Sequence, residues 1–106
     1  LVGGMGLAPC AEIGDEHALF QPSHGSAPDI VGTGKANPTA MLLSTAMMLD
    51  WLGARHKLDA LTDASLILEA AIDKAYAERI RPFEFGGSNG TADITRAVIA
   101  EIEAAK

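Results

Sequence analysis

The chain has 106 residues, enough for one domain, and its 48% hydrophobic and 21% charged residues are ordinary for a globular protein. Its formal net charge of -6 opposes broad binding to nucleic acid or anionic membranes, because such polymers and surfaces would repel it. The single cysteine, Cys10, excludes an internal disulfide and a cysteine-pair metal site, which fits a reducing cytoplasm.

The chain opens at Leu1 inside a glycine-rich run, with no initiator methionine and no targeting pattern, and we therefore expect it to be part of a longer protein. The longest weakly polar run, Ala40 to Leu49, is well short of the roughly 20 residues of a membrane span. Most glycines precede Asn37. This distribution predicts a turn-rich first third and a helical remainder.

Two short apolar segments, Ala11 to Ile13 and Ala18 to Phe20, predict partly buried strands joined by a polar turn. The following stretch, Ser23 to Ala36, has no helical or strand period and exceeds the usual connection of about 4 to 6 residues. Loops of this length in compact domains are usually functional or disordered. We expect this one to carry the function.

Asn37-Pro38 predicts a helix start, because asparagine can accept a bond from an orphan N–H and proline at the first position lacks one. We expect this helix to end near Leu52, before Gly53, and to be buried on nearly all sides, with its methionines filling the core.

Two more helices are predicted. One should span Lys57 to Glu78, and after a loop over residues 79–89 the other should begin at a Thr91 cap. Their expected apolar faces are formed by Leu61, Leu68, Ile72 and Ala75 in the first and by Ile94, Ala97, Val98 and Ile102 in the second.

Phosphate-binding motifs are the first chemistry to test in the long loop. Gly32-Thr33-Gly34 begins like the dinucleotide fingerprint, but its sixth position is Asn37 and no strand directly precedes it, so the Rossmann pattern fails. A Walker-type loop fails because its Gly-Lys-Ser/Thr triplet is absent at the required spacing. A less specific nucleotide cradle remains, since glycines admit a ligand close to the backbone and a helix start attracts anions.

Individual polar residues leave alternatives open. His24 could stack beside a ligand or bond its own backbone. Asp29 could bind a ribose diol or serve the turn after Pro28. Lys35 could meet a phosphate, although solvation of the loop is the preferred interpretation. His17 and His56 are expected at the surface.

The run HGSAPDI at residues 24–30, followed by Gly32, Gly34 and ANPTA at residues 36–40, closely resembles the cofactor loop of the isopropylmalate/isocitrate dehydrogenase family, most like its 3-isopropylmalate dehydrogenases. The likeness extends to GGMGLAP at residues 3–9, to residues 47–49 and to Gly86-Gly87 with Thr91. It implies an α/β fold unlike the Rossmann one. Residues 1–106 would form the C-terminal portion of the cofactor-binding large domain, with short strands, a long cofactor loop and three helices.

The resemblance also implies a role for each loop residue. His24 would lie against the adenine, Asp29 would hold the ribose hydroxyls and Asn37 would bond the adenine edge. Family members that use NADP tend to have Lys and Tyr at positions 29 and 30, and a carboxylate repels the extra phosphate, so Asp29-Ile30 points to NAD. The complete cofactor-binding set is His24, Gly25, Ser26, Ala27, Asp29, Ile30 and Asn37. Glu84 matches an acidic family position only loosely.

The parent enzyme is then expected to catalyse NAD- and Mg²⁺- or Mn²⁺-dependent oxidative decarboxylation of a 3-substituted malate. 3-Isopropylmalate is the first choice of substrate, with tartrate, isocitrate and homoisocitrate as alternatives. Catalytic and metal-binding residues are expected before Leu1 and none within the chain. The expected partners are the hydroxy-acid substrate, the rest of its own large domain and a second copy in a full-length homodimer.

One residue departs from the family pattern, because Gln21-Pro22 stands where Glu-Pro is usual and an amide replaces a negative charge behind the loop. A hypothesis of another class is a packing or assembly piece without measurable ligand affinity, since part of a domain exposes apolar surface.

Overall fold

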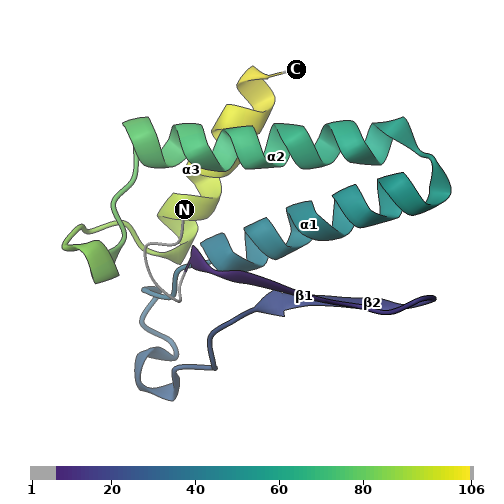
Figure 1. The fold of residues 1–106 in the computed structure, drawn as a ribbon. Helices are drawn as coiled ribbons and strands as arrows, with labels where there is room; N and C mark the ends of the chain where they lie inside the picture. The colour runs from purple at the N-terminus through teal and green to yellow at the C-terminus, as the bar shows by residue number, and fades with distance from the viewer. Residues whose placement is uncertain (1–6, 106) are drawn as a thin grey trace.

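The structure, a computed structural model, describes residues 7–105 apart from the side chain of Glu84. Most of the glycine-rich opening run falls outside the described residues. A β-hairpin is followed by the long loop and three helices (Figure 1), which confirms the predicted α/β class. The elements are β1 (Pro9–Ile13), β2 (Ala18–Pro22), the 3-10 turn η2 (Pro28–Ile30), α1 (Thr39–His56), α2 (Asp59–Glu78), the 3-10 turn η3 (Phe83–Phe85) and α3 (Thr91–Ala104).

The two strands pair antiparallel, with Ala11 opposite Phe20 and Ile13 opposite Ala18. Each is longer than predicted and both are partly buried, as expected. Because side chains alternate between the two faces of a strand, Phe20 faces α1 while its neighbour Leu19 is exposed. The Phe20 ring lies 6.2 Å from the Trp51 ring of α1, centroid to centroid, which joins the hairpin to the helices.

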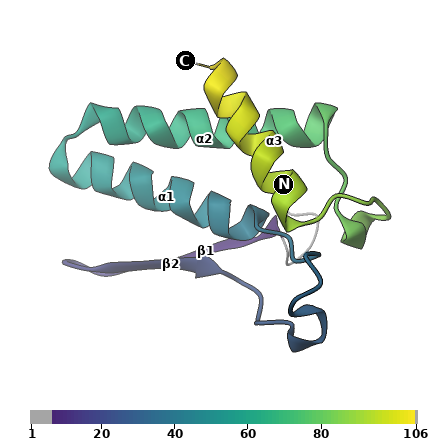
Figure 2. The ribbon, with the colours of Figure 1, turned by 180° about the vertical axis from the view of Figure 1, so that it is seen from behind.

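Helix α1 lies between the hairpin and α2, and α3 crosses at an angle (Figures 1 and 2). The buried positions of α1 hold small residues, which allow the hairpin and α2 to approach it closely on both sides. They are Thr39, Ala40, Ser44, Ala46 and Gly53. The expectation that α1 is buried on nearly all sides is wrong at Met41, because this residue is 52% exposed to solvent. Met41 is therefore not core filler, whereas Met47 and Met48 are half-buried.

The predicted end of α1 before Gly53 is wrong. The helix continues through Gly53 to His56 and ends at Lys57, which takes a left-handed conformation at φ 55°. Gly53 is buried against α2 instead, and a Cβ there would lie 2.8 Å from the Thr62 backbone nitrogen. This glycine serves helix packing and not helix termination, and α2 accordingly begins two residues later than predicted, at Asp59.

The main core lies between α2 and α3 and confirms the predicted apolar faces, except that Leu61 is only half-buried and lies outside this cluster. Ile72 and Ile94 are 3% and 0% exposed, and full burial of such a side chain contributes about 1.5–3 kcal/mol. The buried cluster consists of Ala71, Ile72, Ala75, Ile80, Ile94, Ala97 and Val98, with Leu42, Leu43, Leu68, Tyr76 and Ile102 packed around it. Within residues 7–105, no helix combines the length and the apolar character that a membrane crossing requires.

Candidate functional site

The long loop hangs beside the start of α1, away from the helical layers (Figure 1). Its tip is a series of tight turns around η2, in which the backbone N–H groups of Ile30 and Thr33 donate to Ala27 and Ile30 carbonyls at 3.1 Å each. Gly32 and Gly34 have φ of 81° and 72°, a left-handed conformation that glycine adopts without steric cost. The glycines thus permit the curled shape of the loop.

A shallow cavity of about 220 Å³ lies on the inner side of this loop. Of the seven predicted cofactor residues, Ser26, Ala27 and Ile30 line it. The remaining lining residues are Val31, Gly32, Gly34, Ala36 and Thr91. Since pockets for whole small molecules measure about 300–1,000 Å³, this one suits part of a ligand.

Asp29 and His24 lie at the exposed surface of the loop. Among the residues the structure describes, none donates a hydrogen bond or forms an ion pair with the Asp29 carboxylate. His24 Nδ1 lies 2.9 Å from the Gly25 carbonyl oxygen, and because a carbonyl oxygen can only accept, Nδ1 is the donor in this contact. The local backbone bond expected for this histidine is present, and the carboxylate at position 29 can receive hydroxyl groups.

Asn37 is half-buried at the start of α1 and belongs to a small polar network. Its Oδ1 accepts from the Thr39 backbone N–H at 2.9 Å, and its Nδ2 donates to the Tyr76 hydroxyl at 3.1 Å. The helix begins at Thr39 with Pro38 in the cap position, later than predicted, but Asn37 still receives an orphan N–H as expected. A side-chain bond from Asn37 to a ligand would compete with Tyr76.

Thr91 does not cap α3, contrary to prediction. Gly90 occupies the cap position, and its N–H donates to the Asp93 carboxylate at 3.2 Å. The Thr91 N–H instead donates to the Gly34 carbonyl at 2.9 Å, and its hydroxyl donates to the Ala36 carbonyl. Sequence reasoning missed this link between the loop and α3, because no local pattern marks a contact between segments so far apart in the chain.

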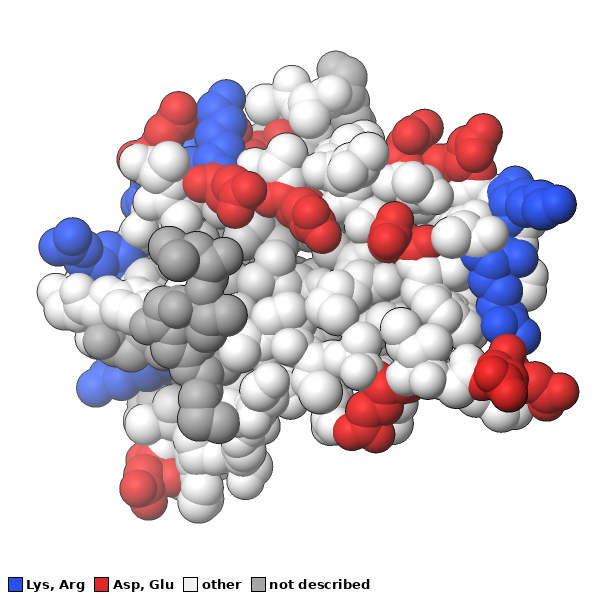
Figure 3. All heavy atoms as spheres, in the orientation of Figure 1, with Lys and Arg blue, Asp and Glu red and all other residues white. Residues whose placement is uncertain are grey.

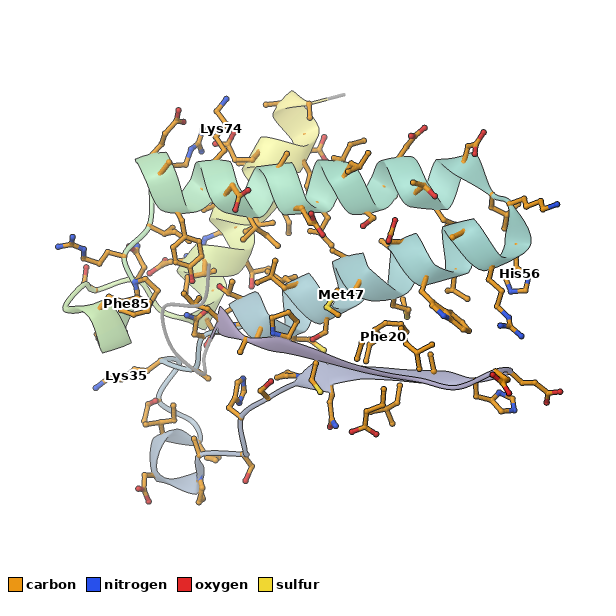
Figure 4. The ribbon with its side chains drawn as sticks, in the orientation of Figure 1. Phe20, Lys35, Met47, His56, Lys74 and Phe85 are labelled. Atoms are coloured by element: carbon orange, nitrogen blue, oxygen red, sulfur yellow. The ribbon has the colours of Figure 1, made fainter. Side chains whose placement is uncertain are left out.

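A cation–π contact adds to the same junction. The Lys35 ammonium group lies 5.2 Å from the Phe83 ring centroid and so contacts η3. The sequence instead favoured a lysine that only solvates the loop. Figure 4 shows Lys35 on the loop, near the turn that carries Phe85.

Metal-binding groups are not assembled in the described part of the chain. There, no three His, Cys, Asp or Glu side chains lie close enough together to hold an ion. Glu12, Asp15 and Glu16 are all exposed on the hairpin, and His17 and His56 are exposed as predicted.

Comparisons with known proteins agree on one family. The family model described as isocitrate/isopropylmalate dehydrogenase matches residues 1–98. The isocitrate/homoisocitrate dehydrogenase of Thermus thermophilus is 47% identical over 103 residues, covering 97% of this chain and 29% of that protein. The homoisocitrate dehydrogenase of Methanocaldococcus jannaschii is 48% identical over 94 residues, covering 89% and 25%. The 3-isopropylmalate dehydrogenase of Methanothermobacter thermautotrophicus is 41% identical over 103 residues, covering 97% and 29%.

Solved structures show the same relationship. The β-decarboxylating dehydrogenase of Thermococcus kodakarensis, in its apo form, superposes with a TM-score of 0.83 at 41% identity, over 96% of this chain and 28% of that one. The isocitrate dehydrogenase of Methylococcus capsulatus gives 0.82 at 37% identity, over 94% and 28%. The chain therefore spans less than a third of the length of these relatives. It belongs to the isocitrate/isopropylmalate dehydrogenase family.

Proposed function

We propose that this chain is the NAD-binding part of a dehydrogenase that oxidises and decarboxylates a 3-substituted malate. The observation that carries the proposal is the loop over residues 24–30. It joins the family's cofactor sequence to an exposed carboxylate at Asp29 and to a cavity lined by Ser26, Ala27 and Ile30.

Each loop residue has a task in this proposal. Asp29 receives the two adenosine ribose hydroxyls and repels the additional phosphate of NADP, because its carboxylate has acceptors only and carries negative charge. His24 lies against the adenine, and residues 25–27 line the cofactor with backbone groups. We assign Asn37 to the adenine edge through its main chain, because its carboxamide is already bonded to Thr39 and Tyr76.

This assignment limits the chain to binding and orientation. When bound, NAD supplies a hydride acceptor, and Mg²⁺ or Mn²⁺ supplies Lewis-acid stabilisation of the developing oxo and enolate oxygens. The described residues contain no assembled metal-ligand group. We propose that the metal ligands and the catalytic Tyr and Lys lie outside residues 1–106.

The substrate belongs to the 3-substituted malates, and 3-isopropylmalate is our first candidate from the likeness of the loop. Isocitrate and homoisocitrate form the second candidate, because the relatives named for them are 47–48% identical to this chain over the aligned residues, against 41% for the isopropylmalate enzyme above. The loop itself contacts the cofactor and not the substrate side chain in this proposal.

The rest of the large domain is the partner we propose for the open face of the chain. In Figure 3 the middle of the face over α1 shows a broad area without charged side chains. Met41 of α1 is an exposed apolar side chain, at 52% exposure, and Leu66 of α2, at 62%, lies beside the end of α3. An uncharged face of this kind is typical of a surface that packs against protein.

The test is a turnover assay on the full-length protein with 3-isopropylmalate, isocitrate, homoisocitrate and tartrate, each with NAD or NADP and with Mg²⁺ or Mn²⁺. We expect NAD reduction with one of the four acids, a higher kcat/KM with NAD than with NADP, and loss of activity with a chelator. Reduction of neither cofactor by any of the four acids, together with no NAD binding by calorimetry, would favour the packing-piece hypothesis instead.

A further inference from the structure

Thr91 forms two hydrogen bonds with the part of the cofactor loop that leads into α1. Its N–H donates to the Gly34 carbonyl at 2.9 Å, and its hydroxyl donates to the Ala36 carbonyl. Both carbonyl-bearing residues line the loop cavity, as Thr91 itself does. Because these two hydrogen bonds reach carbonyls two positions apart, they restrain both the position and the orientation of this part of the loop.

The other described hydrogen bonds of residues 24–36 are local. They connect positions no more than three residues apart, such as Thr33 Oγ1 to the Ile30 carbonyl at 2.6 Å, and so shape the tip without tying it to the helices. Within the described part of the chain, Thr91 supplies the hydrogen bonds between residues 24–36 and the helical body, and Asn37, directly after them, bonds Tyr76 of α2. The Lys35 contact with Phe83 is a weaker link to the same region.

The start of α3 is a firm anchor for this purpose. Ile94 and Val98 are 0% and 2% exposed in the main core, so the helix carrying Thr91 is fixed by packing. Gly90 permits the close approach, because a Cβ at this position would collide with the Gly34 carbonyl oxygen. The position of the loop is therefore set by a helix that begins more than fifty residues later in the chain.

We propose that Thr91 is a positioning residue for the cofactor loop, holding the carbonyls of Gly34 and Ala36 so that the cavity is formed before the cofactor arrives. This proposal rests on the proposed function. Because ordering a free loop on binding costs conformational entropy, a loop already held in place binds more tightly. The effect belongs to cofactor affinity and not to the chemical step.

The test compares four forms of the full-length protein: wild type, Thr91→Val, Thr91→Ser and Thr95→Val. Thr91→Val keeps the side-chain shape and the N–H bond but removes the hydroxyl, whereas Thr91→Ser keeps the hydroxyl. Thr95 is the matched control, because it is half-buried on the same helix and its hydroxyl donates to the Thr91 carbonyl at 2.9 Å, not to the loop.

For Thr91→Val we expect the Kd and KM for NAD to rise about threefold to tenfold, the loss of one net hydrogen bond, with kcat within twofold of wild type. Amide hydrogen exchange over residues 24–36 should accelerate without cofactor present. Thr91→Ser and Thr95→Val should behave as wild type. A wild-type Kd in Thr91→Val, an equal loss in Thr91→Ser, or a fall in kcat at unchanged KM would each overturn the proposal.

The exchange measurement separates this inference from the proposed function. If the wild-type protein binds no NAD, the proposed function fails, and exchange in the apo protein still decides the role of Thr91. Unchanged loop exchange in Thr91→Val then refutes positioning, and faster exchange supports it.

Discussion

The hydroxyl groups of Tyr76 and Thr39 lie 2.6 Å apart and connect the last turn of α2 to the start of α1. Tyr76 lies on α2, and its hydroxyl also accepts a hydrogen bond from Asn37 Nδ2 at 3.1 Å. Thr39 is 2% exposed, so water cannot easily replace a lost partner. This contact fixes the point at which the cofactor loop ends and the helices begin.

Replacement of Tyr76 with Phe should therefore destabilise the protein. We expect the free energy of unfolding to fall by about 1–2 kcal/mol, because the buried Thr39 hydroxyl loses its partner. Urea denaturation of the full-length protein measures this loss. As a control, Thr45→Ala removes an exposed hydroxyl that bonds only its own helix, at the Met41 carbonyl, and should change stability much less. Equal losses in the two variants would contradict the prediction.

Glu101 is a buried carboxylate, 4% exposed, that α3 places between two cations of the preceding segment. Arg79 Nε lies 2.8 Å from Oε2 and Lys74 Nζ lies 3.6 Å from Oε1. Among the described residues, none gives the Oε2 atom a hydrogen bond of good geometry despite the short distance, so the Arg79 contact acts mainly through charge. Arg79 is the closer partner and should matter more.

For Arg79→Ala we expect a loss of about 2 kcal/mol in unfolding free energy, below the usual cost of breaking a buried pair, because Arg79 is half-exposed and Lys74 remains. Lys74→Ala should cost less than about 1 kcal/mol. Arg96→Ala is the matched control, since its pair with Asp93 is exposed on both sides and should contribute about 0–1 kcal/mol. Thermal or urea unfolding at moderate salt measures the loss of unfolding free energy in each of the three variants. A loss in Arg96→Ala as large as that in Arg79→Ala would contradict this prediction.

Gly53→Ala should separate α1 from α2. Although alanine favours a helix over glycine by about 1 kcal/mol, the added methyl group would meet Thr62, and overpacking of this kind costs about 1–3 kcal/mol. We expect a net loss of stability, measured by the midpoint of thermal unfolding. Gly25→Ala, where a Cβ meets nothing within 4 Å, serves as the stability control. An increased midpoint for Gly53→Ala would show that the helices adjust freely.

Asp29 should set the choice between the two nicotinamide cofactors. For Asp29→Asn we expect kcat/KM with NAD to fall about tenfold to one-hundredfold, the contribution of a charge-assisted hydrogen bond, while that with NADP stays level or rises. Steady-state kinetics with both cofactors give the ratio. Asp63→Asn alters a similarly exposed carboxylate on α2 and should leave the ratio unchanged. An unchanged ratio in Asp29→Asn would remove Asp29 from the proposed site.

Local sequence patterns predicted much of this fold. Apolar spacing located the cores of α2 and α3, with Ile72 and Ile94 buried as expected, because helical periodicity depends only on neighbouring residues. The absence of any period over residues 23–36 likewise located the loop. Gly53 was misinterpreted because a glycine that ends a helix and one that admits a neighbouring helix look alike in a sequence.

The amino-acid sequence by itself determined the order of the elements, the place of the long loop, the family and the candidate residues His24, Asp29 and Asn37. Only the tertiary structure decided which partners these segments have: Thr62 against Gly53, Tyr76 against Asn37, and Thr91 against Gly34 and Ala36. The reason is physical, since caps, turns and periodicity arise from neighbours in the chain. Contacts between distant segments exist only once the helices have packed and fixed their distances.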